Sequence, residues 1–136
     1  MKQAFSTFLV LSAALIALSS CVTTPAVTQM REANAMLKQA SEKTQQGNFA
    51  EADNAAAAIG RSVRSGVELA PIAQNKGGGK VDLKPMLTAW ESSSYKDLRK
   101  ALKRSDEKSA AIAFTQLRGQ CTNCHAAIGR PNINVN

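Results

Sequence analysis

The sequence is 136 residues long, carries 17 lysine and arginine residues against 10 acidic ones, and has a formal net charge of +7. This length suits a single domain. The basic residues are dispersed without interleaved aromatic residues, which argues against nucleic-acid binding, and no Ser/His/Asp set, paired carboxylates or phosphate loop indicates an enzyme. A basic surface favours acidic partners or anionic headgroups, with a merely solvated helix face as the alternative.

The beginning of the chain has the composition of a secretory signal. Lys2 supplies a positive charge, and residues 4–18 form an apolar run that is too short and too weakly flanked for a membrane-spanning helix. We therefore expect residues 1–20 to be removed on export. This lowers the net charge from +7 to +6 because Lys2 is lost. Nucleic acid is not an expected partner outside the cytoplasm.

The residues before Cys21 are more specific. Leu18-Ser19-Ser20-Cys21 resembles the bacterial lipobox, in which the cysteine becomes the lipid-modified first residue of the mature protein. Acyl chains at Cys21 would anchor the protein through a tether of residues 21–25, whereas ordinary cleavage would leave an unpaired cysteine in an oxidising compartment. Val22, in place of Asp, is typical of lipoproteins of the outer membrane. We expect the periplasmic side of the envelope, with the outer membrane favoured over the inner.

Residues 26–130 are expected to form an all-α domain, an antiparallel four-helix bundle, followed by a tail of residues 131–136. Apolar residues recur at helical spacing on both sides of a turn at Gly47-Asn48, which predicts a first and a second helix. The expected inward positions are Val27, Met30, Ala33, Leu37 and Ala40 in the first helix and Phe49, Ala52, Ala56, Ile59, Val63 and Val67 in the second.

A long connection separates these two helices from the next two. Residues 70–84 contain Pro71 and Gly77-Gly78-Gly79, which a helix interior does not tolerate well, and nothing in the chain reads as a strand. Pro85 suits the first turn of a third helix, and Ser105 with Asp106 and Glu107 supplies the cap and acidic first turn of a fourth. The expected inward positions are Leu87, Trp90, Ser94, Leu98 and Ala101, then Ala110, Phe114, Leu117, Cys121, Cys124 and Ile128.

The fourth helix carries Cys121-Thr122-Asn123-Cys124-His125, the attachment pattern of c-type haem. In that chemistry both thiols add to the haem vinyl groups and the imidazole takes an axial position on the iron. On a helix the three side chains lie close together, so one turn presents them to one edge of a porphyrin. Small residues such as Ala55 to Ala58 leave room for a flat macrocycle. We expect one covalent haem c that also completes the core.

A zinc site and a redox dithiol or disulfide are the alternative interpretations of this pattern. Zinc needs about four ligands, whereas His125 is the only histidine and Cys21 has its expected role in lipidation. A thioredoxin-like dithiol requires a βαβ setting. Covalent haem c is made on the outer side of the bacterial inner membrane in systems resembling this one, which agrees with the export signal.

The whole pattern resembles the class II c-type cytochromes, the cytochrome c prime group. The resemblance is carried by the four-helix pattern with CxxCH in the last helix, by Phe49 after a turn glycine and by Pro85 shortly before Trp90. It implies a sixth iron position that faces the first helix, with methionine there in low-spin members and an apolar residue in five-coordinate ones. Ile128-Gly129-Arg130 replaces the usual CH-x-x-aromatic-Arg continuation, so the family's packing at that edge is not implied.

Within this resemblance Met30 is the expected distal ligand, because the start of the first helix lies near the end of the fourth in an antiparallel bundle. Met36 lies off the inward seam and is the alternative ligand, and Met86 is a weaker one. No Met or His follows His125, and methionine as core filler would leave an open site. Arg31 resembles the first-helix arginine near a haem propionate, unless it is a solvated helix charge.

The expected function depends on the distal residue. With methionine on the iron, the protein is a one-electron carrier whose basic surface attracts a redox partner with an acidic docking surface. With an open site, it binds or senses small gases such as NO or CO. A haem-free structural lipoprotein with a disulfide between Cys121 and Cys124 is the remaining alternative. A homodimer, as some relatives form, is compatible with each of them.

Overall fold

The computed structural model describes residues 23–135, so the expected signal peptide and the expected lipidation site at Cys21 lie outside the described residues. The described chain is mostly helical, which confirms the all-α prediction at this level. Its helices are α1 (Pro25–Gln45), α2 (Phe49–Leu69), α3 (Lys84–Ser92), α4 (Ser94–Lys103) and α5 (Glu107–Ala127). Two short strands, β1 (Ile72–Gln74) and β2 (Lys80–Asp82), lie between α2 and α3.

The first two helices lie on either side of the predicted turn at Gly47-Asn48, and α1 already begins at Pro25, a residue predicted to belong to the tether. Thr24 caps α1 by accepting a hydrogen bond from the backbone N–H of Val27 at 3.4 Å, and Pro25 occupies the first helical position. Gly47 has φ 73°, a left-handed conformation that glycine adopts without steric cost, so the chain reverses there and α2 begins at Phe49. The two helices then pack along each other as an antiparallel pair.

The predicted third helix is broken in two. Ser93 has φ −119° and ψ −108°, outside the helical region, and it separates α3 from α4. The side-chain amide of Gln120 on α5 holds this break, because it donates to Ser93 Oγ at 2.9 Å and accepts from Ser94 Oγ. The buried positions Trp90, Ser94, Leu98 and Ala101 are nevertheless those predicted for one continuous helix.

The connection before α3 also differs from the prediction, since β1 and β2 form an antiparallel hairpin in which Ala73 is paired with Val81. The side-chain oxygen of Asn75 accepts hydrogen bonds from the backbone N–H groups of Gly77 and Gly79 at 2.9 and 2.8 Å. These bonds tie the glycine-rich segment into a tight turn. The expectation of a chain without strands was therefore wrong for this segment.

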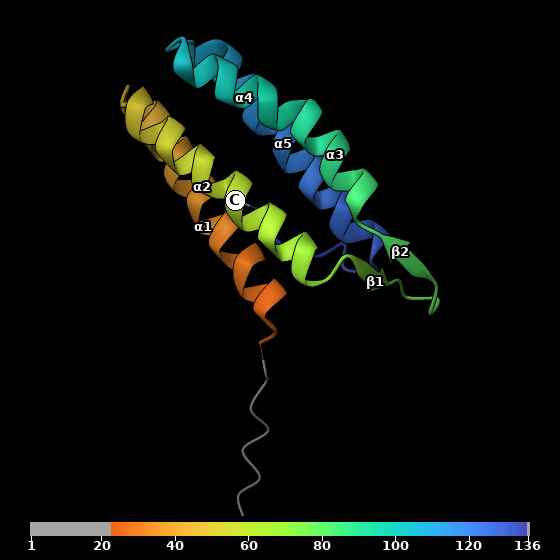
Figure 1. Ribbon diagram of the computed structural model, residues 1–136. Coiled ribbons are helices and arrows are strands. Elements are labelled where there is room, and N and C mark those ends of the chain that lie inside the picture. The colour runs from red at the N-terminus through yellow and green to blue at the C-terminus, as the bar shows by residue number, and fades with distance from the viewer. Residues whose placement is uncertain (1–22, 136) are drawn as a thin grey trace, which may run out of the picture.

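The helices lie as two antiparallel pairs side by side (Figure 1). The first pair is α1 and α2, and in the second pair α3 and α4 follow each other as one broken helix beside α5. The pairs meet mainly where α2 packs against α4. The start of α1, the end of α2, the β hairpin and the end of α5 lie at the same end of the molecule (Figure 1). The largest fully buried side chains are Leu37, Ile59, Leu98, Leu102 and Leu117, and much of the remaining core is alanine.

Candidate functional site

The Cys-x-x-Cys-His sequence lies near the end of α5, which begins at a side-chain cap. Asp106 accepts a hydrogen bond from the backbone N–H of Ser109 at 3.0 Å. About four turns later, Cys121, Cys124 and His125 are all partly buried, and Cys121 packs against the core cluster. Both cysteines are free thiols. The helix predicted to carry the three side chains is therefore confirmed, and it brings them together at one end of the molecule.

Burial keeps both thiols in the neutral form. It raises the pKa of Cys121 to about 11, with a smaller contribution from the neighbouring Cys124. The pKa of Cys124 is raised by burial as well. The neutral thiol is a weak nucleophile in comparison with the thiolate. Neither cysteine therefore has the low pKa that is typical of a catalytic or redox-active thiol.

His125 is held as a neutral imidazole. Burial lowers its pKa, and the positive charge of Arg130 lowers it further. The Nδ1 atom is buried and has no hydrogen-bond partner among residues 23–135. A buried polar nitrogen without a partner costs about 1–3 kcal/mol. The neutral imidazole is the form that binds metal ions, so both the charge state and the missing partner are consistent with a ligand at this side chain.

No group of three or more His, Cys, Asp or Glu side chains within residues 23–135 is arranged to hold a metal ion. Any metal at His125 would therefore need ligands of another kind, either a methionine or a cofactor that brings its own donor atoms. A porphyrin is such a cofactor, since its four nitrogens leave only the axial positions to the protein.

The candidate distal ligand Met30 lies at the same end of the molecule but faces α2. A β-carbon built on Gly66 would lie 2.7 Å from Cε of Met30, so the methionine methyl fills the space that this glycine leaves. The alternative ligand Met36 is partly buried and packs against the core cluster. Met86, near the start of α3, is also partly buried.

The candidate propionate ligand Arg31 is exposed on α1. Its Nη1 atom donates to the hydroxyl of Thr23 at 3.4 Å, so the guanidinium reaches back over the start of the helix. Arg118, one turn before the cysteines, lies 5.7 Å from the ring centre of Phe114. A guanidinium over an aromatic ring is attracted to its face.

The C-terminal tail crosses from α5 to α1. Gly129 reverses the chain with φ 73°, and the side-chain amide of Asn34 donates to the backbone oxygen of Asn134 at 3.4 Å. Val135 then packs against the core cluster. The tail therefore connects the end of α5 with the middle of α1, a role that the sequence did not indicate.

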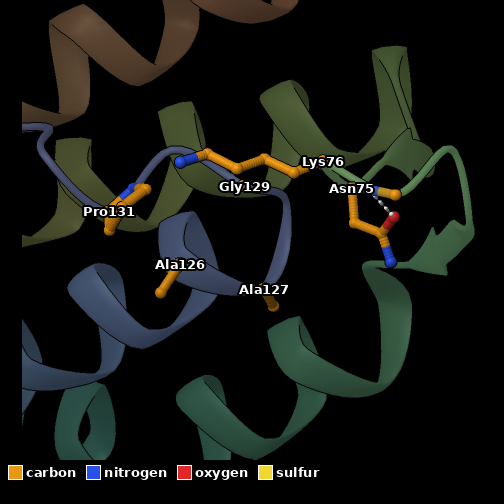
Figure 2. A pocket seen from close by; sticks show the side chains of 7 residues that line it. Asn75, Lys76, Ala126, Ala127, Gly129 and Pro131 are labelled. Atoms are coloured by element: carbon orange, nitrogen blue, oxygen red, sulfur yellow. Dashed lines mark hydrogen bonds between the residues drawn. The ribbon is translucent and has the colours of Figure 1, made fainter.

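The β hairpin closes over the end of α5 and leaves an open hollow there (Figure 2). Lys76 extends past Gly129 toward Pro131 in this view. The hollow is about 300 Å³ in volume, and Ala126 and Ala127 line its α5 side. Because each helical residue is rotated by about 100° from the last, Ala126 faces away from the two cysteines, whereas Ala127, three residues after Cys124, lies on the same side of α5 as Cys124. The hollow therefore borders the turn of α5 that carries Cys124.

Among residues 23–135, no helix is both long and apolar enough to span a membrane. Comparisons of the chain with models of protein families, with curated proteins and with solved structures found no match.

Proposed function

We propose that this chain is a haem-c protein of the bacterial cell envelope that transfers one electron at a time, similar to the class II c-type cytochromes. The observation that carries the proposal is the end of α5, where two free thiols and a neutral imidazole lie within one and a half helical turns. When bound, the haem supplies an iron that alternates between two oxidation states.

The three side chains fit a covalent haem in their chemistry. Thioether formation uses both thiols, and neither Cys121 nor Cys124 is committed to a disulfide. His125 can bind iron through one ring nitrogen, while the other is already shielded from water. A hydrogen-bond acceptor brought to the Nδ1 atom of His125 when the haem binds would remove the free-energy cost of leaving that nitrogen buried without a partner.

The architecture we propose is an antiparallel four-helix bundle that holds the haem between α1 and α5, near the C-terminal end of α5. The alanine-rich core supports this arrangement, because small side chains leave less apolar volume of their own to fill the interior. The tail at Asn134 lies across the same region. Haem attachment would therefore displace the tail from Asn34.

The electron-transfer proposal requires Met30 to turn away from Gly66. Methionine has three rotatable bonds and a soft thioether, so this change of rotamer needs no movement of the helix backbone. In the haem-bound protein, the thioether of Met30 would be the second protein ligand of the iron, in place of a site left open for external ligands. This favours electron transfer over the binding of external ligands.

The alternative function is the binding or sensing of NO or CO by a five-coordinate iron. One observation favours it: the methyl of Met30 is seated against Gly66 on α2 and not toward α5. If this seat persists in the haem-bound protein, the distal side of the iron stays open to small ligands.

The site of action that we propose is the periplasmic side of the envelope. Lipidation at Cys21 would anchor the chain just before α1 begins at Pro25. This places the start of α1 and the CxxCH turn at the membrane-proximal end of the molecule. A homodimer is compatible with this arrangement.

The test is to purify the exported protein and record its mass and its oxidised and reduced absorption spectra. A mass increase of one haem that persists after denaturation supports the class. A low-spin spectrum that is lost in Met30→Ala and kept in Met36→Ala supports electron transfer. Cys121→Ala/Cys124→Ala is the control, since it removes both thioethers and should abolish the covalent haem.

The contrary results are equally clear. A colourless mature protein with free or oxidised thiols contradicts haem binding altogether. A high-spin spectrum that neither methionine variant changes, together with CO binding to the reduced protein, favours the gas-binding alternative.

A further inference from the structure

The surface of α4 gathers positive charge around an open hollow of about 590 Å³. The lining residues are Glu91, Tyr95, Lys96, Arg99, Lys100, Lys103 and Arg104. Arg99 is paired with Asp53, and Glu91 with Arg64. Lys96, Lys100 and Lys103 make no ion pair within residues 23–135, while the charge of Arg104 also acts on the nearby carboxyl of Asp106 and helps to lower its pKa. The hollow therefore carries an uncompensated positive charge that the CxxCH site does not use.

Tyr95 connects this hollow with the interior. Its ring stacks on that of Trp90, with ring centres 4.4 Å apart and planes inclined by 19°. The Tyr95 hydroxyl accepts a hydrogen bond from Arg99 Nη1 at 3.2 Å, and the same guanidinium binds Asp53. Trp90 is only 5% exposed, and its Nε1–H is buried without an acceptor among the described residues. The aromatic pair thus runs from the surface into the core.

The contacts between α5 and the break at Ser93 show which turn of α5 lies beside Trp90. Gln120 of α5 bonds to both Ser93 and Ser94 at the break. Since α3 and α5 run antiparallel beside each other (Figure 1), moving one turn back from Ser94 to Trp90 corresponds to moving one turn forward from Gln120. Trp90 therefore lies at the level of the turn that carries Cys124.

We propose that the hollow on α4 is the docking surface for an acidic redox protein, and that Tyr95 and Trp90 link it to the haem-bearing turn. This inference rests on the proposed electron-transfer function and names the surface that serves it. In the exchange, the iron of the reduced protein loses one electron and the oxidised centre of the partner gains it. No bond forms or breaks, and no proton is transferred.

The shape and charge of this surface favour a protein as the binding partner over a membrane. Unpaired lysines attract carboxylates over a long range, and this attraction orients a partner before contact. A concave surface with an aromatic ring in its wall accommodates protruding side chains, whereas the headgroups of a bilayer form a broad and nearly flat surface.

The first experiment measures docking without electron transfer. The full exported protein is titrated with an oligomer of L-glutamate, and backbone amide shifts are followed by NMR. We expect the shifts to gather between Tyr95 and Arg104 and to weaken with added salt. Lys100→Glu should lower the affinity by about fivefold to tenfold. Lys38→Glu is the matched control: it makes the same charge change on α1, where the Lys38 side chain is 66% exposed.

Equal losses in the two variants would overturn the proposal, because they would show an effect of net charge alone. Tighter binding of the same surface to phosphatidylglycerol vesicles than to the glutamate oligomer would also overturn it in favour of a membrane contact. If the purified protein contains no haem, the proposed function fails, while this titration still decides whether the acidic docking surface exists.

The second experiment tests the aromatic link. The reduced protein is oxidised by hexacyanoferrate(III), an anionic one-electron acceptor, in a stopped-flow instrument. We expect Lys100→Glu and Tyr95→Leu to slow the reaction several-fold, and Tyr95→Phe, which keeps the ring, to leave the rate unchanged. Equal slowing by Tyr95→Phe and Tyr95→Leu would refute a role for the stacked rings. An unchanged rate in Lys100→Glu would refute the hollow as the entry point.

Discussion

Two buried glycines on α2 should respond in opposite ways to the same substitution. A β-carbon at Gly60 would lie 2.5 Å from Cζ of Tyr95, inside the phenol group. That ring is rigid, stacks on Trp90 and accepts a hydrogen bond from Arg99. A β-carbon at Gly66 would clash with the terminal methyl of Met30, which can rotate away, and its other neighbours, at 3.5 Å, are at ordinary contact distance.

The magnitudes follow from these contacts. Each glycine-to-alanine change in a helix interior gains about 1 kcal/mol of backbone stability. In Gly60→Ala this gain is outweighed by about 1–3 kcal/mol of overpacking and by about 1 kcal/mol each for a damaged ring stack and a lost hydrogen bond. We expect Gly60→Ala to lower the free energy of unfolding by about 2 kcal/mol or more, and Gly66→Ala to leave it unchanged or slightly higher.

Urea unfolding followed by circular dichroism measures both variants against the unmodified protein, with equal m-values as the condition for comparing midpoints. In thermal unfolding the loss in Gly60→Ala corresponds to about 8–16 °C in Tm. The reasoning is refuted if the two variants unfold at the same urea concentration, because the ring of Tyr95 would then yield as easily as a methionine methyl.

Other predictions concern α5. Leu117→Ala should cost about 2–5 kcal/mol, because the side chain is 0% exposed, whereas Ile112→Ala, at a side chain that is 54% exposed, should stay within about 0.5 kcal/mol; equal urea midpoints would contradict this. In haem-free protein, alkylation of Cys121 below pH 9 should be roughly a hundredfold slower than in the unfolded chain, since its pKa is raised from 9.0 to about 11; equal rates would show that the thiol is not buried. In the same haem-free protein, burial lowers the pKa of His125 below 6.5, so just below that pH only the unfolded chain binds this proton, and stability should fall as the pH drops from 6.5 toward the folded pKa. His125→Gln should remove this part of the pH dependence of the urea midpoint, and an unchanged profile would exclude His125 as its source.

The helices were predictable because their signals are local. Pro25, Gly47 and Asp106 mark helix ends through backbone geometry and capping, and the apolar positions between them repeat at helical spacing. The short hairpin was missed because each strand has only three residues, too few to show an alternating pattern. The signal that was available is Asn75 before the glycines, a residue suited to tight turns.

The candidate site was predictable only along α5. The spacing of Cys121, Cys124 and His125 is a property of one helix, and the structure has all three residues on α5, as the sequence predicts. The position of the Met30 side chain depends on Gly66, which lies on another helix. The break at Ser93 depends on Gln120 of α5. Such contacts between distant segments leave no periodic signal in the sequence. The role of the tail at Asn134 was missed for the same reason.

The hydrogen bond between Asn34 and Asn134 joins positions that are 100 residues apart. The α1–α2 turn, by contrast, closes within a few residues, so that pair can form early, while the contact between α1 and the tail carries the entropy cost of a very long loop. Any site built jointly by α1 and the segment after α5 should therefore form late in folding, once the chain as far as Asn134 is available.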